Sequence, residues 1–225
     1  MKTIGLICEG VSEINIMTRI ISKYLGDDVV VRPIEPQVKV KNGFLVQGSY
    51  GGWQQVLNHC NDETIENILS FNDYLVVQID TDTCFMAGYD VNPLDDNTGK
   101  PKAVEILYED IKARLLQNVS KDVQEHYSGR LIFAISINEI ECWLLPIYYT
   151  DNTKCKTNNC IYTLNRALQK KNLGRISDND DKNSVNARGV YMKILKNLKN
   201  KQSIQDCAQH QYGFMQLVKQ LDMIA

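Results

Sequence analysis

Acidic side chains follow three apolar runs of this sequence, at the point where each run ends. Glu9 closes the first run, and each of two later runs is followed by a pair of acids that are two residues apart. The six acids of interest are Glu9, Glu13, Asp80, Asp82, Glu139 and Glu141. Because residues two apart in an extended segment project to the same side, each pair can face one point. Carboxylates that crowd together repel one another unless a cation lies among them, so the pattern predicts a metal site.

The type of ligand indicates which metal this site would hold. Carboxylate oxygens without histidine or cysteine favour Mg²⁺, Mn²⁺ or Ca²⁺. Magnesium held by few carboxylates keeps positions for water and for phosphate oxygens, which suits phosphoryl transfer or phosphodiester hydrolysis. The predicted cofactor is therefore Mg²⁺ or Mn²⁺.

A simpler explanation exists for most of these acids. Loops at strand ends are polar because they lie at the surface, which would account for Asp80 and Asp82. Glu13, Glu139 and Glu141 could complement helix dipoles, the last two at a helix that begins near Ile140. Glu9 is harder to explain in this way, since it directly follows a buried strand.

The acids depend on the elements before them, which the hydrophobic pattern predicts. Short apolar runs predict strands at 3–8, 29–34, 74–79 and 131–137. Helical spacing predicts helices at 14–25, 53–69, 103–116, 158–171, 187–199 and 212–222. We expect Ser12 to cap the first helix, a hairpin within 36–50 to turn at Asn42-Gly43, and a polar loop to span 84–101.

Strands that alternate with helices predict an α/β fold, with a mostly parallel sheet flanked by helices. We expect an α/β domain over residues 1–149 and a helical C-terminal extension, residues 150–225, packed on it. In an open parallel sheet, ligands bind beyond the carboxyl ends of the strands, where the acids lie.

Composition limits the partners and the compartment. The 225-residue chain has a formal net charge of −2, so any nucleic acid must be bound by a local basic patch or through metal. The seven cysteines include no C-x-x-C pair, which predicts free thiols in a reducing cytosol. The sequence shows neither a signal peptide nor an apolar run of ~20 residues, so we expect a cytoplasmic protein without a membrane span.

Two motifs together resemble the signature of the Toprim domain family. They are Glu9-Gly10-x-Ser12-Glu13 after the first strand and Asp80-x-Asp82 after a later one. The segment INEIECWLLP resembles a motif of bacterial Toprim-like families often linked to phage defence, the RloB and DUF4276-like groups. The segment QYGFMQLVKQL resembles their closing helix, with Gly213-Phe214 where those families usually carry Ser-Phe.

The resemblance implies a Toprim-like fold and a Mg²⁺-dependent nuclease that acts on DNA or RNA, in a phage-defence setting. Glu9 would be the catalytic or metal-steering acid, and Asp80 and Asp82 would be catalytic residues that ligate Mg²⁺. Glu13, Glu139 and Glu141 would be supporting metal residues.

Many Toprim nucleases also carry a basic residue near the metals. Candidates here are Lys182, Arg188 and Lys193, although a solvated, charged helix face is the simpler explanation for each. The sequence has no P-loop, so any ATPase would be a separate partner.

Two other functions fit the same residues. A non-catalytic Toprim module would bind a partner or nucleic acid and use metal only to neutralise the acidic edge. The segment QIDTDT also resembles the D-x-D-x-T motif of haloacid-dehalogenase-like phosphatases, with Cys84 where that motif has threonine, but that motif normally follows the first strand of its fold and leaves Glu9 without a role.

Overall fold

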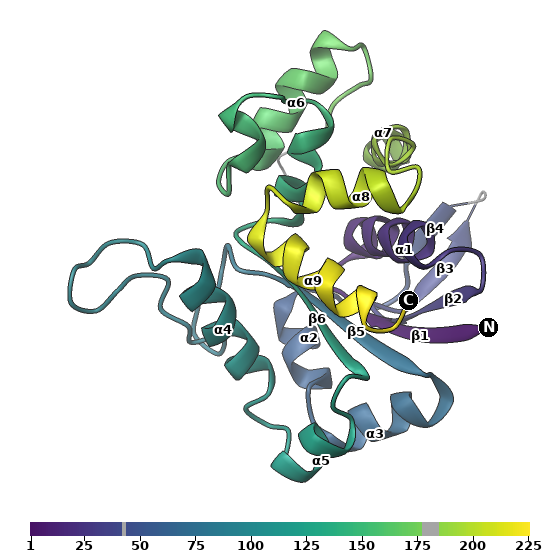
Figure 1. The fold of residues 1–225 in the computed structure, drawn as a ribbon, viewed down its shortest axis with the longest axis vertical. Coiled ribbons are helices and arrows are strands. Elements are labelled where there is room, and N and C mark those ends of the chain that lie inside the picture. Colours follow the sequence, from purple (N-terminus) through teal and green to yellow (C-terminus); the bar gives the residue numbers. More distant parts are fainter. Residues whose placement is uncertain (42–43, 177–184) are drawn as a thin grey trace.

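The computed structural model describes residues 1–41, 44–176 and 185–225. It contains a four-stranded parallel sheet with strand order β2-β1-β5-β6 (Figure 1). The strands are β1 (Lys2–Ile7), β2 (Val29–Glu35), β5 (Tyr74–Asp80) and β6 (Leu131–Ser136). The predicted α/β class with a parallel sheet is therefore confirmed.

The central strands are buried on both faces, as their nearly continuous apolar runs predict. Along β5, the side chain of Val76 packs into one hydrophobic core, while Leu75 and Val77 pack into the other. This alternation follows from the two-residue period of a strand. In the parallel register, Ile7 of β1 lies opposite Val77 of β5, so the carboxyl ends of these strands meet at one edge.

Helices cover both faces of the sheet (Figure 1). One core contains residues of α2 (Trp53–His59), α3 (Asp62–Phe71), α4 (Val104–Leu115) and α5 (Lys121–His126). The other contains residues of α1 (Val11–Leu25), the 3₁₀ helix η1 (Ile140–Ile147), α6 (Cys160–Lys170), α7 (Val185–Leu195), α8 (Lys201–Ala208) and α9 (Tyr212–Asp222). A second 3₁₀ helix, η2, spans Asn152–Cys155.

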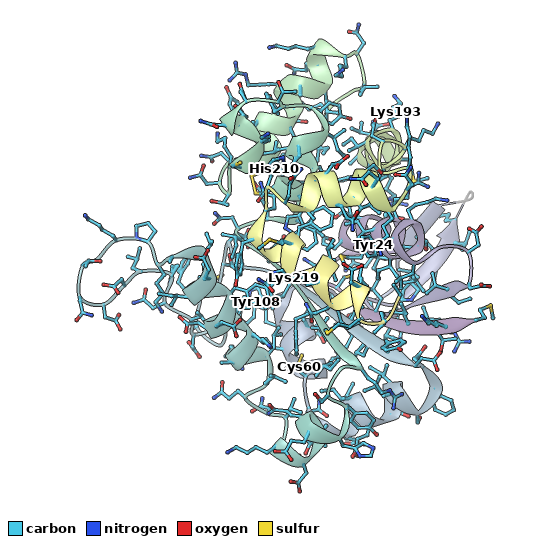
Figure 2. The ribbon with its side chains drawn as sticks, in the orientation of Figure 1. Tyr24, Cys60, Tyr108, Lys193, His210 and Lys219 are labelled. Atoms are coloured by element: carbon cyan, nitrogen blue, oxygen red, sulfur yellow. A yellow bond between two sulfur atoms is a disulfide. The ribbon has the colours of Figure 1, made fainter. Side chains whose placement is uncertain are left out.

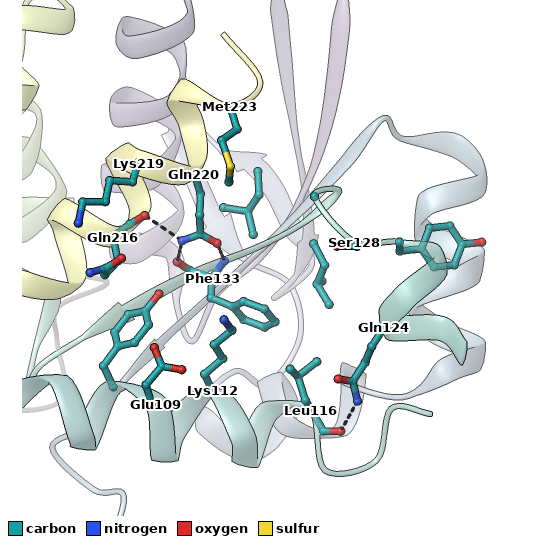
Figure 3. A pocket seen from close by; sticks show the side chains of 15 residues that line it. Glu109, Lys112, Leu116, Gln124, Ser128, Phe133, Gln216, Lys219, Gln220 and Met223 are labelled. Atoms are coloured by element: carbon teal, nitrogen blue, oxygen red, sulfur yellow. Dashed lines mark hydrogen bonds between the residues drawn. The ribbon is translucent and has the colours of Figure 1, made fainter. Parts of the chain in front are cut away.

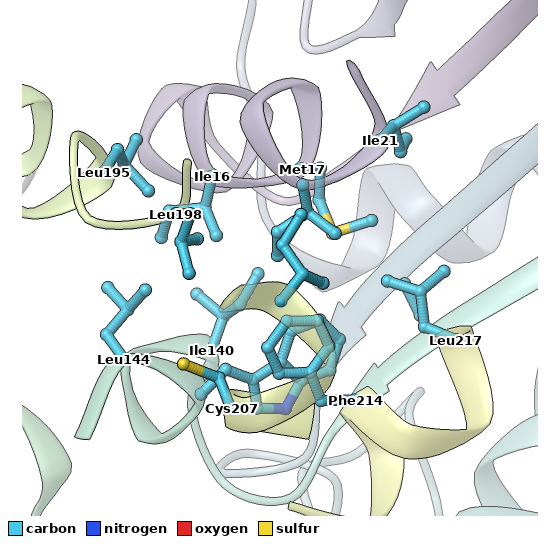
Figure 4. Packing of buried hydrophobic residues seen from close by; sticks show 14 of the residues in the cluster. Ile16, Met17, Ile21, Ile140, Leu144, Leu195, Leu198, Cys207, Phe214 and Leu217 are labelled. Carbon is cyan, nitrogen blue, oxygen red and sulfur yellow. The ribbon is translucent and has the colours of Figure 1, made fainter. Parts of the chain in front are cut away.

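The C-terminal helices share a hydrophobic core with the sheet and α1. Figure 4 shows Ile16 and Met17 of α1 in the same cluster as Leu217 and Phe214 of α9. The ring of Phe214 stacks on Trp143 of η1, with centroids 4.6 Å apart and planes at 8°. Burial against the sheet thus stabilises the helical C-terminal region, which the sequence predicted.

Some predicted elements were wrong in detail. The helix predicted at 53–69 is two helices, because the Asn61 side chain accepts a hydrogen bond from the Thr64 amide at 3.0 Å and starts a new helix there. The short helices α5 and α8 were not predicted. The predicted hairpin pairs β3 (Val38–Lys41) with β4 (Phe44–Gln47), and its predicted turn at residues 42–43 lies outside the described residues.

The prediction of free thiols is wrong for two cysteines. Cys142 and Cys160 form a disulfide, with Cα atoms 5.0 Å apart. These residues are 18 apart in sequence, and packing of α6 on η1 brings them together. The other cysteines are free: Cys8, Cys60, Cys84, Cys155 and Cys207. No helix among the described residues is long and apolar enough to cross a membrane.

Candidate metal centre

The strand order reverses between β1 and β5, which is where open α/β sheets have their ligand-binding crevice. From β1 the chain passes through α1 to β2 on one side of β1, and it later returns to β5 on the other side. Ligands of open α/β sheets bind outside the carboxyl ends of the strands at such a reversal of strand order. Glu9 follows β1 and Asp80 ends β5, so both lie at this position.

Glu9 connects the ends of the two central strands. Its Oε1 accepts a hydrogen bond from the Asp80 amide at 2.7 Å, and its own amide donates to Gln78 Oε1 at 3.4 Å. Its carbonyl accepts from the Gly52 amide at 2.7 Å. A Cβ on Gly51 would lie 2.2 Å from the Glu9 carbonyl oxygen, so this approach requires glycine.

Asp80 is the buried last residue of β5. Its Oδ1 accepts a hydrogen bond from Gln78 Nε2 at 2.8 Å, and its carbonyl accepts from the Tyr89 hydroxyl at 3.0 Å. The Tyr89 ring stacks on Trp53, with centroids 5.3 Å apart. The loop after β5 therefore folds back and holds the end of the strand in place.

Glu13 lies buried in the first turn of α1, beside the same edge. Its Oε2 accepts a hydrogen bond from the Ser12 hydroxyl at 2.8 Å. The prediction that Ser12 caps α1 is wrong, because Gly10 is the N-cap and no side chain caps this helix. Ser12 instead orients the Glu13 carboxylate.

Three of the predicted acids raise the pKa of one buried thiol. Burial raises the pKa of Cys8 well above its usual value, and the charges of Glu13, Asp80 and Glu9 raise it further. A thiolate there is disfavoured by desolvation and by like charge. The carboxylates from β1, α1 and β5 therefore lie close enough to share one electrostatic environment.

Asp82 is the exposed member of the group. Its amide donates to the Asn138 carbonyl at 3.2 Å, which ties the segment after β5 to the segment after β6. Burial raises the pKa of the nearby Tyr89 phenol, and the charges of Glu9, Asp80 and Asp82 contribute to this shift. Asp82 thus shares the field of Glu9 and Asp80.

Glu139 and Glu141 do not face one point, because η1 begins between them at Ile140 and ends the extended conformation. Glu139 Oε1 accepts hydrogen bonds from the amides of Cys160 and Ile161, at 2.8 and 3.3 Å, and so caps α6. The predicted dipole contact thus exists for Glu139 but with a different helix.

Glu141 is completely buried and accepts a hydrogen bond from the Tyr191 hydroxyl of α7. Burial raises the pKa of Tyr191 most, and the charges of Glu141 and Glu13 raise it further. The charge of Glu13 therefore acts on both Cys8 and Tyr191 and links the two groups of acids electrostatically.

A second set of donor atoms lies next to this cluster. A Glu139 oxygen and the sulfur atoms of Cys142 and Cys160 lie within 4.8 Å of one another. The two sulfurs are joined in the disulfide, and Glu139 caps α6. In this form the set is a structural junction between η1 and α6.

Glu35 is an acid that the sequence interpretation missed. It is the buried last residue of β2, and its carbonyl accepts from the Cys8 amide at 2.8 Å. Its carboxylate accepts from Ser49 Oγ at 3.4 Å and lies 3.9 Å from His59 Nε2. Applying the strand-end argument to the second predicted strand would have found it. With Glu35, an acid lies at the carboxyl end of each strand of the sheet.

The predicted basic residues do not form one solvated face. Arg188 is buried and donates to the Leu45 carbonyl at 2.8 Å, so the solvated-face interpretation is wrong for this residue. Lys193 donates to the Leu173 carbonyl at 3.3 Å and is exposed on α7 (Figure 2). Lys182 lies outside the described residues.

The cavity between α4, β6 and α9 is separate from the predicted acids (Figure 3). Its lining includes Glu109, Lys112, Phe133, Gln216 and Gln220, and none of the six predicted acids. It lies beside the edge strand β6, away from the crevice between β1 and β5.

Comparison with known proteins gives no further assignment. The sequence matches no model of a protein family, no curated protein and no solved structure.

Proposed function

We propose that this protein is a divalent-metal-dependent phosphodiesterase of the Toprim type that cleaves nucleic acid at the carboxyl edge of its sheet. The observation that carries this proposal is the 2.7 Å hydrogen bond from the Asp80 amide to Glu9 Oε1. It joins acids 71 residues apart in sequence at the crevice where an α/β sheet binds its ligand.

The donor set fits Mg²⁺ or Mn²⁺. Glu9, Asp80, Asp82 and Glu13 offer only carboxylate oxygens, the ligands that these hard cations prefer. Hydrogen bonds from Ser12 and Gln78 orient Glu13 and Asp80, as outer contacts do for metal ligands. Glu13, Asp80 and Glu9 all raise the pKa of Cys8, so their charges act in one region, and metal binding would relieve their mutual repulsion.

Each acid has a proposed part in the reaction. Asp80 and Asp82 would hold the metal, with the exposed Asp82 nearest to incoming substrate. When bound, the metal would supply charge stabilisation for a phosphoryl oxygen. Glu9, which is only half-buried, would orient or deprotonate the attacking group.

The position of Glu9 favours this proposal over a haloacid-dehalogenase-like phosphatase. In that chemistry the two aspartates of D-x-D-x-T act as nucleophile and general acid, and Glu9 has no part. Here Glu9 is hydrogen-bonded to the residue that would be the nucleophile, Asp80. A non-catalytic Toprim module uses the same acids, so cleavage is the measurement that separates it from the nuclease.

The test is cleavage of mixed DNA and RNA substrates with Mg²⁺ or Mn²⁺. We expect Glu9→Gln to reduce cleavage by at least ~100-fold, the lower range for loss of an acid–base group, and Asp80→Asn to abolish cleavage through loss of a metal ligand. The exposed Glu66→Gln on α3 is the matched control and should cleave normally. Retained cleavage in both site variants would contradict the proposal, and metal-dependent binding without cleavage by the unmodified protein would favour the non-catalytic module.

Thermal unfolding adds a measurement that does not depend on activity. Without metal, Glu9→Gln and Asp80→Asn should unfold at the same temperature as the unmodified protein or higher, because each removes a repelling charge. Mn²⁺ should raise the midpoint of the unmodified protein and raise that of Asp80→Asn much less, because ligand binding to the folded state stabilises it.

A further inference from the structure

We propose that the substrate is unpaired nucleic acid, whose bases stack on Tyr50 and Phe85 and whose phosphates contact Lys39 and Lys41. This inference rests on the proposed function, because it names the substrate class for the same site. It comes from two exposed aromatic rings and two exposed lysines on segments that border the acidic crevice.

Tyr50 precedes the two glycines that contact the Glu9 carbonyl. Its side chain is 91% exposed, although an aromatic ring gains free energy when it is buried. The two residues that follow, Gly51 and Gly52, pack against the Glu9 carbonyl, so the backbone that carries this ring borders the crevice.

Phe85 lies in the segment after β5, three residues after Asp82. The Cys84 amide donates to the Thr81 carbonyl at 3.2 Å, and the Cys84 side chain is buried. This turn fixes the start of the loop, yet the Phe85 side chain is 66% exposed. The neighbouring Met86 is 44% exposed, so the two residues place adjoining apolar surface beside the polar site.

The two aromatic residues belong to one rim. Trp53, three residues after Tyr50, stacks on Tyr89, four residues after Phe85. A Cβ on Gly88 would lie 3.4 Å from the Trp53 ring, so the two segments are in contact. The segments that carry Tyr50 and Phe85 therefore meet beside the end of β5 and form one rim there.

The β3–β4 hairpin supplies positive charge to the same rim. β2 leaves the sheet at its carboxyl end and continues into β3, where Lys39 and Lys41 are exposed and project to the same side. Lys39 Cε lies 3.5 Å from the position of a Cβ on Gly48, two residues before Tyr50. These lysines form a local basic patch in a chain whose net charge is −2.

This combination suits a single strand better than a duplex. Exposed aromatic rings stack on bases with little dependence on sequence, and lysines contact the phosphates. In a duplex the faces of the bases are already stacked on one another and are not available to Tyr50 or Phe85. An unpaired strand offers both its bases and its phosphates.

The test is binding of fluorescent oligonucleotides of about 20 nucleotides, longer than typical single-strand footprints, to the full chain. Single-stranded DNA, single-stranded RNA and the matching duplexes are compared in Ca²⁺. Tyr50→Ala and Phe85→Ala should each weaken single-strand binding about 5- to 150-fold, whereas Tyr50→Phe and Phe85→Tyr should retain it. Phe71→Ala is the matched control, because this ring is 73% exposed and lies near the amino end of β5, away from the acids.

The lysines are tested by the salt dependence of binding. Lys39→Ala and Lys41→Ala should each reduce the slope of log affinity against log salt by about 0.7, the value for one phosphate contact to a single strand. An unchanged slope in both variants would contradict their part in the proposal.

The same samples separate this inference from the proposed function. If Mn²⁺ raises the thermal midpoint of the unmodified protein and of Tyr50→Ala, the metal centre stands. Single-strand affinity that is unchanged in both alanine variants, or duplex binding as tight as single-strand binding, would then overturn the unpaired-substrate inference alone. If Mn²⁺ has no effect on the unmodified protein, the metal centre itself is overturned.

Discussion

At the scale of single residues, close backbone approaches decide which side chains the fold accepts. Gly213, in the first turn of α9, is the clearest example: a Cβ there would lie 1.8 Å from the Ile135 carbonyl oxygen. A serine at this position would not fit here without a shift of α9. The next residue, Phe214, can stack on Trp143 only because α9 lies this close to β6.

We expect Gly213→Ala to lower the free energy of unfolding by about 1–3 kcal/mol, the usual cost of overpacking. Gly189→Ala on α7 is the matched control, because a Cβ there meets no atom within 4 Å. Alanine is the better helix former, so this control should raise the stability by about 0.5–1 kcal/mol. Denaturant titration measures both, and a Gly213→Ala variant as stable as the control would contradict the prediction.

At the scale of elements, α9 closes the free edge of the sheet. Gln220 pairs with β6 as a neighbouring strand would: its Oε1 accepts from the Phe133 amide at 2.9 Å, and its Nε2 donates to the Phe133 carbonyl at 3.0 Å (Figure 3). An unpaired edge strand is a template for association with another chain. A helix side chain thus satisfies the backbone of β6 at Phe133 and hinders strand addition there.

Replacing the side-chain amide of Gln220 should leave the backbone of β6 unpaired at Phe133. We expect Gln220→Leu to lower the free energy of unfolding by about 1–3 kcal/mol, because it leaves the Phe133 amide and carbonyl without these partners. Gln216→Leu, one turn earlier on α9, adds the same apolar side chain as a control. Denaturant titration and light scattering should show lower stability and more self-association for Gln220→Leu only, and equal behaviour of the two variants would argue against edge protection.

At the scale of the whole molecule, a covalent link joins the segment after β6 to the helical C-terminal region. The Cys142–Cys160 disulfide connects η1, which carries Glu141, to the first residue of α6. Both cysteines lie in the core shared by α1 and the C-terminal helices. This disulfide contradicts the prediction that all seven cysteines are free thiols.

The disulfide should contribute to overall stability. Closing a loop of 18 residues predicts a loss of about 3 kcal/mol in the free energy of unfolding when a dithiol reduces it. The double variant Cys142→Ala, Cys160→Ala should be destabilised by at least as much and should not respond to the dithiol. Denaturant midpoints of the unmodified protein that are the same with and without the reductant would show that the link does not stabilise the fold.

The sequence by itself determined the strands and the presence of acids at their ends. Local apolar runs predict buried strands, because each strand of a covered parallel sheet must be apolar on both faces. This local rule placed Glu9 and Asp80 correctly at the ends of β1 and β5. Glu35 ends β2 in the same way, so the same rule identifies it, although it was not among the predicted acids.

Only the tertiary structure decided which of these acids meet. The order β2-β1-β5-β6 places Glu9 against Asp80, while a 3₁₀ helix turns Glu139 towards α6 and Glu141 towards Tyr191. Strand order, the cap of α6 and the Cys142–Cys160 pairing all depend on contacts between distant segments. A local pattern records which residue ends a strand, but it does not record which strand becomes its neighbour, because packing of the whole chain sets that choice.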